Sequence, residues 1–332
     1  MKFELQGFDD GTFARMEEAE LEDQGWRSAD LHVHTLFSHD VLPVPSLHPE
    51  ALYRKAKKMG MGYVTFTDHD TMRAHQVLGD RDGLVTGVEI RIMDPELVGH
   101  TVHVNVYDLD EEEFAELKEI AELEGDLRAF VGLLKRRGLP FTYNHPFWFE
   151  PGERPNLRAI PEIVELFPVV EYNMHRVTKK NELAMAMAHR YEKGLVAVTD
   201  THSGMIGRVL TLSKGDSFRE YFRNIAEGNS RIVTSDLTMQ DLIDEVNAWI
   251  ELIFNLDLAR IDISDFSTGF GNLDRLIRAL TSDRLRGCPR VYGTLERLSR
   301  RLSNTGILAS IYLRMENSIV PQIEDFMMAR LL

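Results

Sequence analysis

The chain has 332 residues, 43% of them hydrophobic, and a formal net charge of −15. This length and composition can bury a large core, and the acidic balance disfavours broad binding to nucleic-acid backbones or anionic membranes. The single cysteine, Cys288, excludes an intramolecular disulfide and a Cys₄ zinc site. The chain has no N-terminal apolar signal stretch and no run of about 20 apolar residues, so we expect a cytoplasmic protein that does not span a membrane.

Residues 1–27 are polar and acidic and predict a lead-in strand or arm. From residue 28, short apolar runs alternate with amphipathic stretches. The apolar runs predict strands at 29–34, 63–67, 84–90, 102–107, 139–144, 169–173, 195–199, 209–212 and 231–233. The amphipathic stretches predict helices at 49–59, 111–124, 126–137, 157–167, 179–193 and 217–227. Strands that alternate with helices predict parallel βα units, in a barrel or an open sheet.

After about residue 235 the pattern becomes helical throughout. Leu242, Val246, Trp249, Ile250 and Ile253 recur on one helical face, and residues 305–332 predict a final helix. We therefore divide the chain into a lead-in segment (1–27), an α/β unit (28–234) and a helical C-terminal extension (235–332). The extension could support a homo-oligomer or cover a pocket.

The histidines are unevenly distributed along the chain. All twelve lie between residues 32 and 202, and residues 203–332 contain none. Imidazole is the commonest neutral metal ligand and the acid/base group of physiological pH. The α/β unit is therefore expected to hold the chemistry.

Five strand ends carry His, Asp or Glu. The motifs are DLHVHT (30–35), TDHDT (67–71), GVEI (87–90), NHP (144–146) and TDTHS (199–203). Residues two apart on a strand face the same side, so His32 can act with His34, and Asp200 with His202. Each motif alone also fits a polar turn, but the carboxyl ends of parallel strands meet at one face, where α/β folds place their sites.

Together the motifs supply some nine nitrogen and oxygen ligands and no thiolate. That is too many for one ion, and it suits two or three divalent ions such as Zn²⁺, Mn²⁺ or Fe²⁺. His100 and His103 are three apart and cannot both face inward on a regular strand. His48, His75 and His189 lie on helical stretches and are expected to be solvated or packing histidines.

The order of these motifs resembles the PHP (polymerase and histidinol phosphatase) family over residues 28–233. The resemblance implies a distorted (β/α)₇ barrel and a metal-dependent phosphoesterase with three metal ions. Carried over position by position, it implies these metal ligands: His32, His34, Asp40, His69, Glu89, His103, His145, Asp200 and His202. Two positions have alternatives, His39 for Asp40 and His100 for His103.

The resemblance also implies a mechanism. A hydroxide that bridges two ions would attack a small phosphomonoester or nucleotide in line, with Glu89 and Asp200 bridging the metals or orienting the hydroxide. Substrate would meet the polar strand end at 171–176, including His175 and Arg176, and also Arg208, which could pair with phosphate. A surface ion pair is the other interpretation of the two arginines.

Other functions remain open from the residues. The same ions could hydrolyse an amide, and an arginine that faces the metals would favour the phosphoesterase. The barrel could instead be a scaffold that binds partners through the extension, although the ligand set is essentially complete. The Phe147–Trp148–Phe149 run could line a substrate pocket or pack under a loop.

Overall fold

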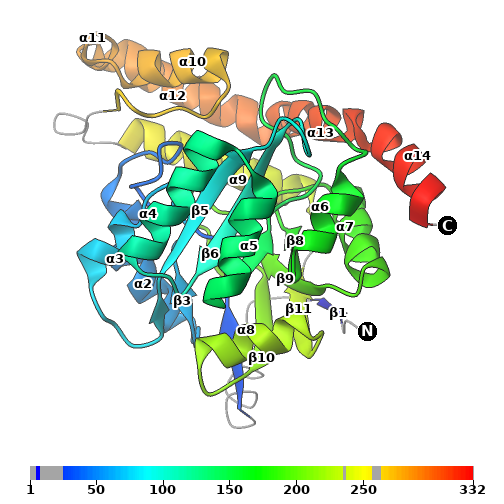
Figure 1. The fold of residues 1–332 in the computed structure, drawn as a ribbon. Coiled ribbons are helices and arrows are strands. Elements are labelled where there is room, and N and C mark those ends of the chain that lie inside the picture. The colour runs from blue at the N-terminus through cyan, green and yellow to red at the C-terminus, as the bar shows by residue number, and fades with distance from the viewer. Residues whose placement is uncertain (1–4, 8–24, 235–236, 256–262, 332) are drawn as a thin grey trace.

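The computed structural model describes residues 5–7, 25–234, 237–255 and 263–331 (Figure 1). Its strands form sheets of five, four and two strands, with helices packed around them. The expectation of a mixed α/β fold is therefore confirmed.

The largest sheet has the order β5-β6-β7-β8-β9. Its strands are β5 (Gly87–Met93), β6 (Thr101–Tyr107), β7 (Phe141–Tyr143), β8 (Val169–Asn173) and β9 (Gly194–Val198). The strands β7, β8 and β9 are parallel, but β6 is antiparallel to both neighbours. Only residues 94–100 join β5 to β6, too few for the crossover that a parallel pair needs. The expectation of parallel units throughout is wrong at β6, and also at the strand Leu210–Lys214, which is antiparallel to both of its neighbours in another sheet.

The two smaller sheets flank the five-stranded one. The four-stranded sheet has the order β1 (Leu5–Gly7), β11 (Ser230–Thr234), β10 (Leu210–Lys214) and β2 (Trp26–Ala29). The two-stranded sheet pairs β3 (Val64–Thr65) with β4 (Leu84–Val85). Among the described strands no sheet closes into a barrel.

The first expected strand, 29–34, differs most from the structure. Strand β2 ends at Ala29, and the following residues pass between two other strand ends. The amide of His34 donates to Thr201 O, and the amide of Thr67 donates to Val33 O. This segment therefore links the ends of different sheets in place of extending one of them, which brings His32 and His34 to the junction.

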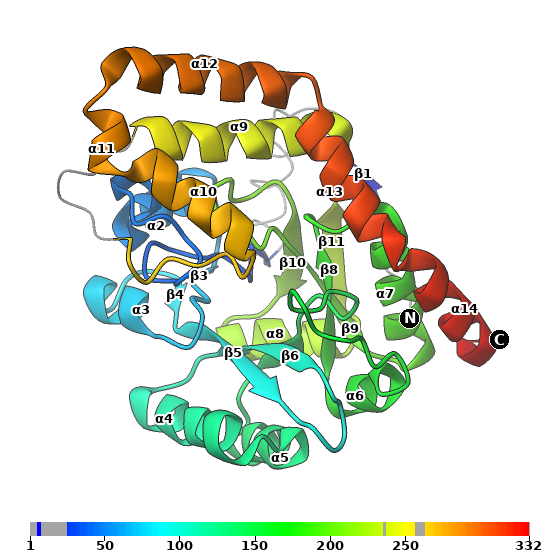
Figure 2. The same cartoon turned by 90° about the horizontal axis from the view of Figure 1, so that it is seen from above.

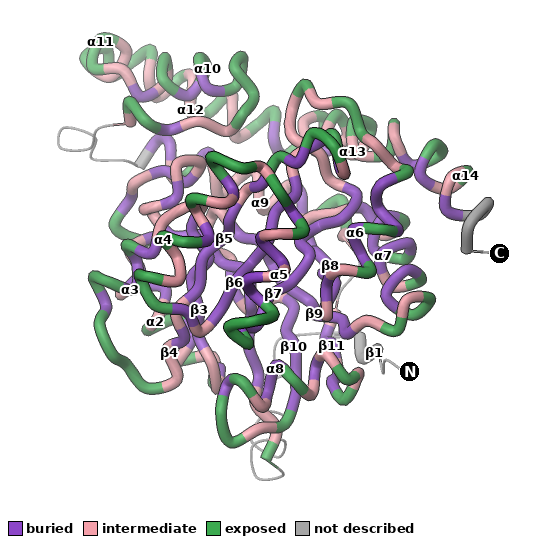
Figure 3. Tube along the Cα trace, viewed as in Figure 1, coloured by how far each residue is buried: buried purple, intermediate pink, exposed green. Residues whose placement is uncertain are grey.

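The helices of the α/β unit follow the expected order. They are α2 (Pro49–Lys58), α3 (Arg73–Leu78), α4 (Glu111–Glu119), α5 (Leu127–Arg137), α6 (Ile160–Leu166), α7 (Thr178–Arg190) and α8 (Phe218–Ala226). A 3₁₀ turn, η1 (Pro45–Leu47), precedes α2, and a π-helical turn, η2 (Ile120–Glu124), follows α4. The short helix α3 was not expected. The strands are buried between these helices, whose outer faces are exposed (Figure 3).

The described part of the C-terminal extension is helical. Its elements are α9 (Met239–Asn255), α10 (Gly271–Thr281), α11 (Asp283–Arg286), α12 (Pro289–Asn304), α13 (Ile307–Ser318) and α14 (Val320–Leu331). The expected single helix 305–332 is two helices, because Pro321 tolerates only the start of a new helix. Figures 1 and 2 show that α9 to α13 lie over one end of the α/β unit, while α14 descends beside α7.

The extension shares its hydrophobic cores with the α/β unit. Ile250, Ile253 and Phe254 of α9 belong to the core that includes Leu52 of α2. Ile323 of α14 belongs to the core of the five-stranded sheet. None of the described helices is long and apolar enough to cross a bilayer.

Candidate metal centre

The residues expected as metal ligands converge between the ends of the sheets. Eight of the nine form three overlapping groups in which the candidate donor atoms lie within 4.8 Å of one another. The groups are His32, His34 and Asp200; His34, Asp40, His69 and His202; and His69, Glu89 and His103. The ninth residue, His145, has its Nε2 3.3 Å from Glu89 Oε1. We call these nine residues the imidazole–carboxylate cluster.

The separations within the first group, and from it to Glu89, have the size expected around a metal ion. His32 Nε2 lies 3.1 Å from His34 Nε2 and 3.1 Å from Glu89 Oε2. Asp200 Oδ1 lies 3.3 Å from the Nε2 atoms of both histidines. Ligand atoms at about 2.1 Å from one ion are roughly 3.0 to 3.4 Å apart in octahedral or tetrahedral geometry. The side chains therefore already stand at the spacing of a coordination shell.

The second group is centred on Asp40, in the polar loop that follows His34. Asp40 Oδ2 lies 2.8 Å from His202 Nε2 and 3.3 Å from His69 Nε2. Ser38 donates to Asp40 Oδ1 at 2.7 Å and so fixes the orientation of this carboxylate. The structure thus places Asp40 in the cluster. The ring of its alternative, His39, lies tilted against the His69 ring, with the centroids 5.0 Å apart, and His39 belongs to none of the three groups.

Glu89 joins the groups because both of its oxygens face imidazoles. Oε2 lies 3.3 Å from His69 Nδ1, and Oε1 lies 3.0 Å from His103 Nδ1. A carboxylate with this placement can bridge two ions. The alternative to His103, His100, packs its ring against Phe149 and accepts from the Asn156 amide, outside the three groups.

Two cluster residues lie in strained backbone. His145 has φ 26° and Asp200 has φ 52°, in the left-handed region that non-glycine residues rarely adopt. Buried hydrogen bonds hold both conformations: the His145 amide donates to Glu171 Oε2, and the Asp200 amide donates to His32 O. Such strain costs roughly 1–3 kcal/mol per residue and is typical of functional sites.

A second layer of polar groups orients the cluster. Glu171 Oε1 lies 2.7 Å from His32 Nδ1, which leaves Nε2 of that ring directed at the cluster. Asn144 donates to Glu89 Oε1 at 2.8 Å, and Asn173 donates to Asp200 Oδ2 at 2.9 Å. Carboxylates and amides in this position fix the tautomer and orientation of metal-binding side chains.

The buried charges of the cluster compensate one another. Burial alone would raise the pKa of Glu89 and Asp200, but the surrounding imidazoles outweigh it and hold both pKa values well below the usual range. Burial likewise opposes the charged imidazoles, but the carboxylates raise the pKa of His34 to about 10 and of His103 to about 9. At His145 burial outweighs the neighbouring carboxylates, and its pKa is lowered. The carboxylates therefore require positive charge, which protons or divalent ions can supply.

A further observation indicates that the donor atoms of the cluster suit divalent ions. His69 Nδ1 is buried without a hydrogen-bond partner among the described residues, although it faces Glu89 Oε2. A neutral imidazole nitrogen needs a proton to share or a metal to bind. Nitrogen and oxygen ligands without thiolate suit Zn²⁺, Mn²⁺ and Fe²⁺.

The three residues expected to bind substrate lie in different surroundings. Arg176 NH2 donates to Asp200 Oδ2 at 3.3 Å, so its guanidinium borders the cluster. His175 Nδ1 lies 3.3 Å from Asp200 O and its Nε2 lies 3.7 Å from Glu245 Oε2 of α9. Arg208, by contrast, pairs with Asp241 of α9, which matches the ion-pair interpretation of this residue.

Trp148 also borders the cluster. Its ring lies 5.3 Å from the His103 ring and 5.1 Å from the His145 ring, and the Arg176 guanidinium lies 5.3 Å from its centroid. The Phe147–Trp148–Phe149 run was expected either to line a substrate pocket or to pack under a loop, and the position of Trp148 fits the first interpretation.

Several roles in the site were not expected from the sequence. Glu171 belongs to the strand end 171–176 that was expected to meet substrate, but it contacts His32; its burial inside an apolar strand is the same signal that pointed to Glu89. Glu150, whose Oε1 lies 3.1 Å from His103 Nε2, follows the NHP motif in a loop without pattern. Glu245 and Tyr312 reach the site from the C-terminal extension, where no sequence signal marks them.

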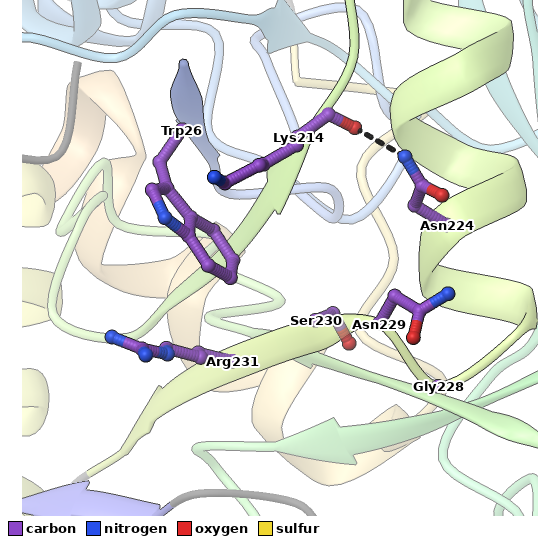
Figure 4. Close-up of a pocket in the computed structure, with 7 residues that line it drawn as sticks. All are labelled: Trp26, Lys214, Asn224, Gly228, Asn229, Ser230 and Arg231. Atoms are coloured by element: carbon purple, nitrogen blue, oxygen red, sulfur yellow. Dashed lines mark hydrogen bonds between the residues drawn. The ribbon is translucent and has the colours of Figure 1, made fainter. Parts of the chain in front are cut away.

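A separate hollow of about 430 Å³ lies near the start of β2, whereas the cluster lies beyond the end of this strand (Figure 4). It is lined by Trp26, Lys214, Asn224, Gly228, Asn229, Ser230 and Arg231. The Trp26 ring lies under Lys214 Nζ at 5.4 Å and under the Arg231 guanidinium at 4.9 Å. This lining contains no histidine or carboxylate, so it offers nothing like the chemistry of the cluster.

Comparison with known proteins gives only distant likenesses. No protein-family profile and no curated protein matches the sequence. PsfC from Pseudomonas syringae is 17% identical, with a TM-score of 0.49, over 70% of this chain and 100% of that one. A proposed metal-dependent phosphoesterase from Bifidobacterium adolescentis is 16% identical, with a TM-score of 0.40, over 60% of this chain and 96% of that one. An amidohydrolase from Chromobacterium violaceum is 16% identical, with a TM-score of 0.35, over 52% and 87% respectively.

Proposed function

We propose that this chain is a metal-dependent phosphoesterase of the PHP type, which hydrolyses a small phosphomonoester or nucleotide. The observation that carries the proposal is the convergence of the imidazole–carboxylate cluster into three groups that could each hold a divalent ion. The ligands would be the nine residues of the cluster, with Glu89 and Asp200 shared between ions. The proposal extends to the fold: the bridges Val33–Thr201 and His69–Glu89 join sheet ends around the cluster, as a distorted (β/α)₇ barrel would require.

The residues of the chain have separate tasks in this proposal. When bound, divalent ions lower the pKa of coordinated water and offset negative charge on phosphate oxygens. Glu171, Asn144 and Asn173 hold the ligand side chains in place, so that little reorganisation is needed during the reaction. Arg176 places positive charge beside Asp200, where a phosphate dianion would otherwise meet a carboxylate, and His175 lies against the Asp200 backbone carbonyl.

Arg176 favours a phosphoester over an amide as substrate. Its guanidinium borders the cluster, and its buried Nε has no hydrogen-bond partner among the described residues. A planar guanidinium pairs well with phosphate oxygens, whereas amide hydrolysis does not need this group. The same proposal includes a small phosphorylated substrate and a cytoplasmic location. It also includes assembly of a homo-oligomer through the C-terminal helices.

The test is phosphate release from a panel of phosphomonoesters, including 4-nitrophenyl phosphate and nucleoside monophosphates, by protein loaded with Mn²⁺, Zn²⁺ or Fe²⁺. A 4-nitroanilide amide panel runs in parallel. We expect turnover of at least one phosphomonoester, and a KM at least about 10-fold higher in Arg176→Ala, the loss of a charged contact. Arg137→Ala is the matched control, because Arg137 forms an exposed ion pair with Glu116. Turnover of amides alone, or of neither panel, would contradict the proposal.

A further inference from the structure

The guanidinium of Arg176 is held from two regions of the chain. From the α/β unit, Asp200 accepts its NH2, and the Trp148 ring lies beneath it. From the C-terminal extension, α13 brings two polar side chains, Tyr312 and Glu316, against the other side. The residue that borders the cluster is therefore fixed in part by a helix far along the sequence.

Tyr312 makes the more specific of the two contacts. Its hydroxyl donates to His175 O at 2.6 Å and lies 3.5 Å from Arg176 NH1, which donates to it. One hydroxyl thus ties α13 both to the backbone of the turn after β8 and to the side chain that follows. Removing this hydroxyl would take one contact from the turn and one from the guanidinium together.

Glu316 adds the charge. Its Oε1 lies 4.0 Å from Arg176 NH1, and its Oε2 accepts from Lys180 Nζ of α7 at 2.9 Å. Lys180 is buried, so it depends on this carboxylate for a partner. The pair anchors α13 to α7, one turn beyond Arg176.

An arginine side chain loses conformational entropy when it is fixed in one orientation. Contacts with α13 fix Arg176 before substrate binds, so substrate binding does not bear this entropic cost. A mobile arginine loses up to about 2 kcal/mol of rotamer freedom when it binds an anion. With NH1 and NH2 already engaged by Tyr312 and Asp200, the guanidinium is oriented in advance, and Nε is left without a partner among the described residues.

We propose that α13 is part of the phosphate-binding site, with Tyr312 and Glu316 acting as positioning residues for Arg176. The inference rests on the proposed function and extends it: the C-terminal extension sets affinity for the phosphate group. It follows that a change in α13 alters phosphate binding through Arg176 and leaves the cluster intact.

The test uses full-length, Mn²⁺-loaded protein and inorganic phosphate as the probe, titrated by calorimetry. Tyr312→Phe removes only the hydroxyl, and we expect the Kd for phosphate to rise about 3- to 10-fold, as for loss of a hydrogen bond. The KM for 4-nitrophenyl phosphate should rise by the same factor, with kcat within about twofold. Manganese content should stay at the value of the unaltered protein, and the melting temperature should fall by no more than about 2–4 °C, as for the loss of one hydrogen bond in a large domain.

The matched control is Tyr292→Phe, which removes another tyrosine hydroxyl of the extension. Tyr292 donates to Ile253 O, away from Arg176, so phosphate affinity should not change. In an Arg176→Ala background, Tyr312→Phe should have no further effect, because its action passes through Arg176. Glu316→Gln, a second variant, should weaken phosphate binding in the same Arg176-dependent way.

Two results would overturn the inference. One is a Kd for phosphate unchanged in both Tyr312→Phe and Glu316→Gln while Arg176→Ala weakens it; the other is an equal effect of Tyr312→Phe with and without Arg176. Failure of the proposed function looks different: the unaltered protein would then neither bind inorganic phosphate nor release it from any monoester.

Discussion

The α/β unit and the C-terminal extension differ in what their sequences supply. The α/β unit holds all twelve histidines and buries a cluster of imidazoles and carboxylates. The extension has no histidine and leaves many large apolar side chains exposed: Leu273, Leu276, Val291, Leu298, Leu302, Ile307, Ile311 and Met315. Yet the extension contacts the edge of the site through a few polar residues.

The comparison separates two tasks. Donor atoms come from strand ends that the fold brings together, so the chemistry belongs to the α/β unit. The contacts that border the cluster from outside, Tyr312 with Arg176 and Glu245 with His175, come from helices. We infer that changes to the donor residues of the α/β unit abolish metal binding, whereas changes in the extension alter substrate affinity or stability. The following experiments test that division.

The largest effect is expected from His34→Ala. His34 belongs to two of the three donor groups, so its loss should affect more than one ion. We predict that kcat/KM for a phosphomonoester falls by more than about 100-fold, beyond the loss typical of outer-layer residues. His189→Ala, which removes an exposed histidine of α7, should leave activity unchanged. A fall in kcat/KM of less than tenfold in His34→Ala would contradict the proposal that the cluster carries the activity.

Glu171→Gln should have the next largest effect. It keeps the size of the side chain but weakens the contact with His32 Nδ1 and the His145 amide. Loss of such an orienting carboxylate costs roughly 10- to 100-fold in metal affinity or activity. Competition with a fluorescent chelator would measure the affinity, and Glu182→Gln, an exposed glutamate of α7, is the control. Equal affinities of both variants would assign Glu171 to packing alone.

Metal affinity should rise with pH. Against the effect of burial, neighbouring carboxylates raise the pKa of His34 to about 10 and of His103 to about 9, so both imidazoles hold protons at neutral pH without metal. An ion must displace those protons, and each proton released raises the affinity about tenfold per pH unit, up to the raised pKa. Calorimetric titration with Mn²⁺ in buffers of different ionisation enthalpy would count the protons. No proton release at pH 7 would contradict the raised values.

The smallest effect on activity is expected from α14. Ile323→Ala removes a fully buried side chain from the core of the five-stranded sheet and should cost about 2–5 kcal/mol of unfolding free energy. Met315→Ala, on the exposed face of α13, should change stability by less than about 0.5 kcal/mol. Denaturant unfolding measures both. Similar small losses in the two variants would mean that the extension is not stabilised by the shared core.

The sequence predicted the meeting of the cluster residues better than the geometry of the strands. The spacing of His32 and His34 predicts that both lie on one strand face, but β2 ends at Ala29 and an irregular segment carries both rings. The conclusion that they act together still holds in space, because the segment is held to Thr201 and Thr67. Short motifs at strand ends therefore indicate which side chains lie close together, even where the predicted backbone conformation is wrong.

Two kinds of feature were not predicted. The antiparallel β6 and the two separate helices of residues 307–331 could have been predicted, because a short connection and a proline in the sequence explain them. The other kind depends on tertiary packing. No such signal marks Tyr312 or Glu316, because a tyrosine and a glutamate on an amphipathic helix are ordinary surface residues. Their role depends on where α13 lies, which is decided by packing over a long sequence separation.

The measurement that tests the account most directly is elemental analysis of protein purified without chelator or metal-binding tag. We predict two to three equivalents of Mn, Fe or Zn per chain, and a sharp fall in an Asp200→Ala/His202→Ala variant that remains folded. Less than one equivalent, even after reconstitution with Mn²⁺ or Zn²⁺, would contradict the metal centre and favour a scaffold role for the chain.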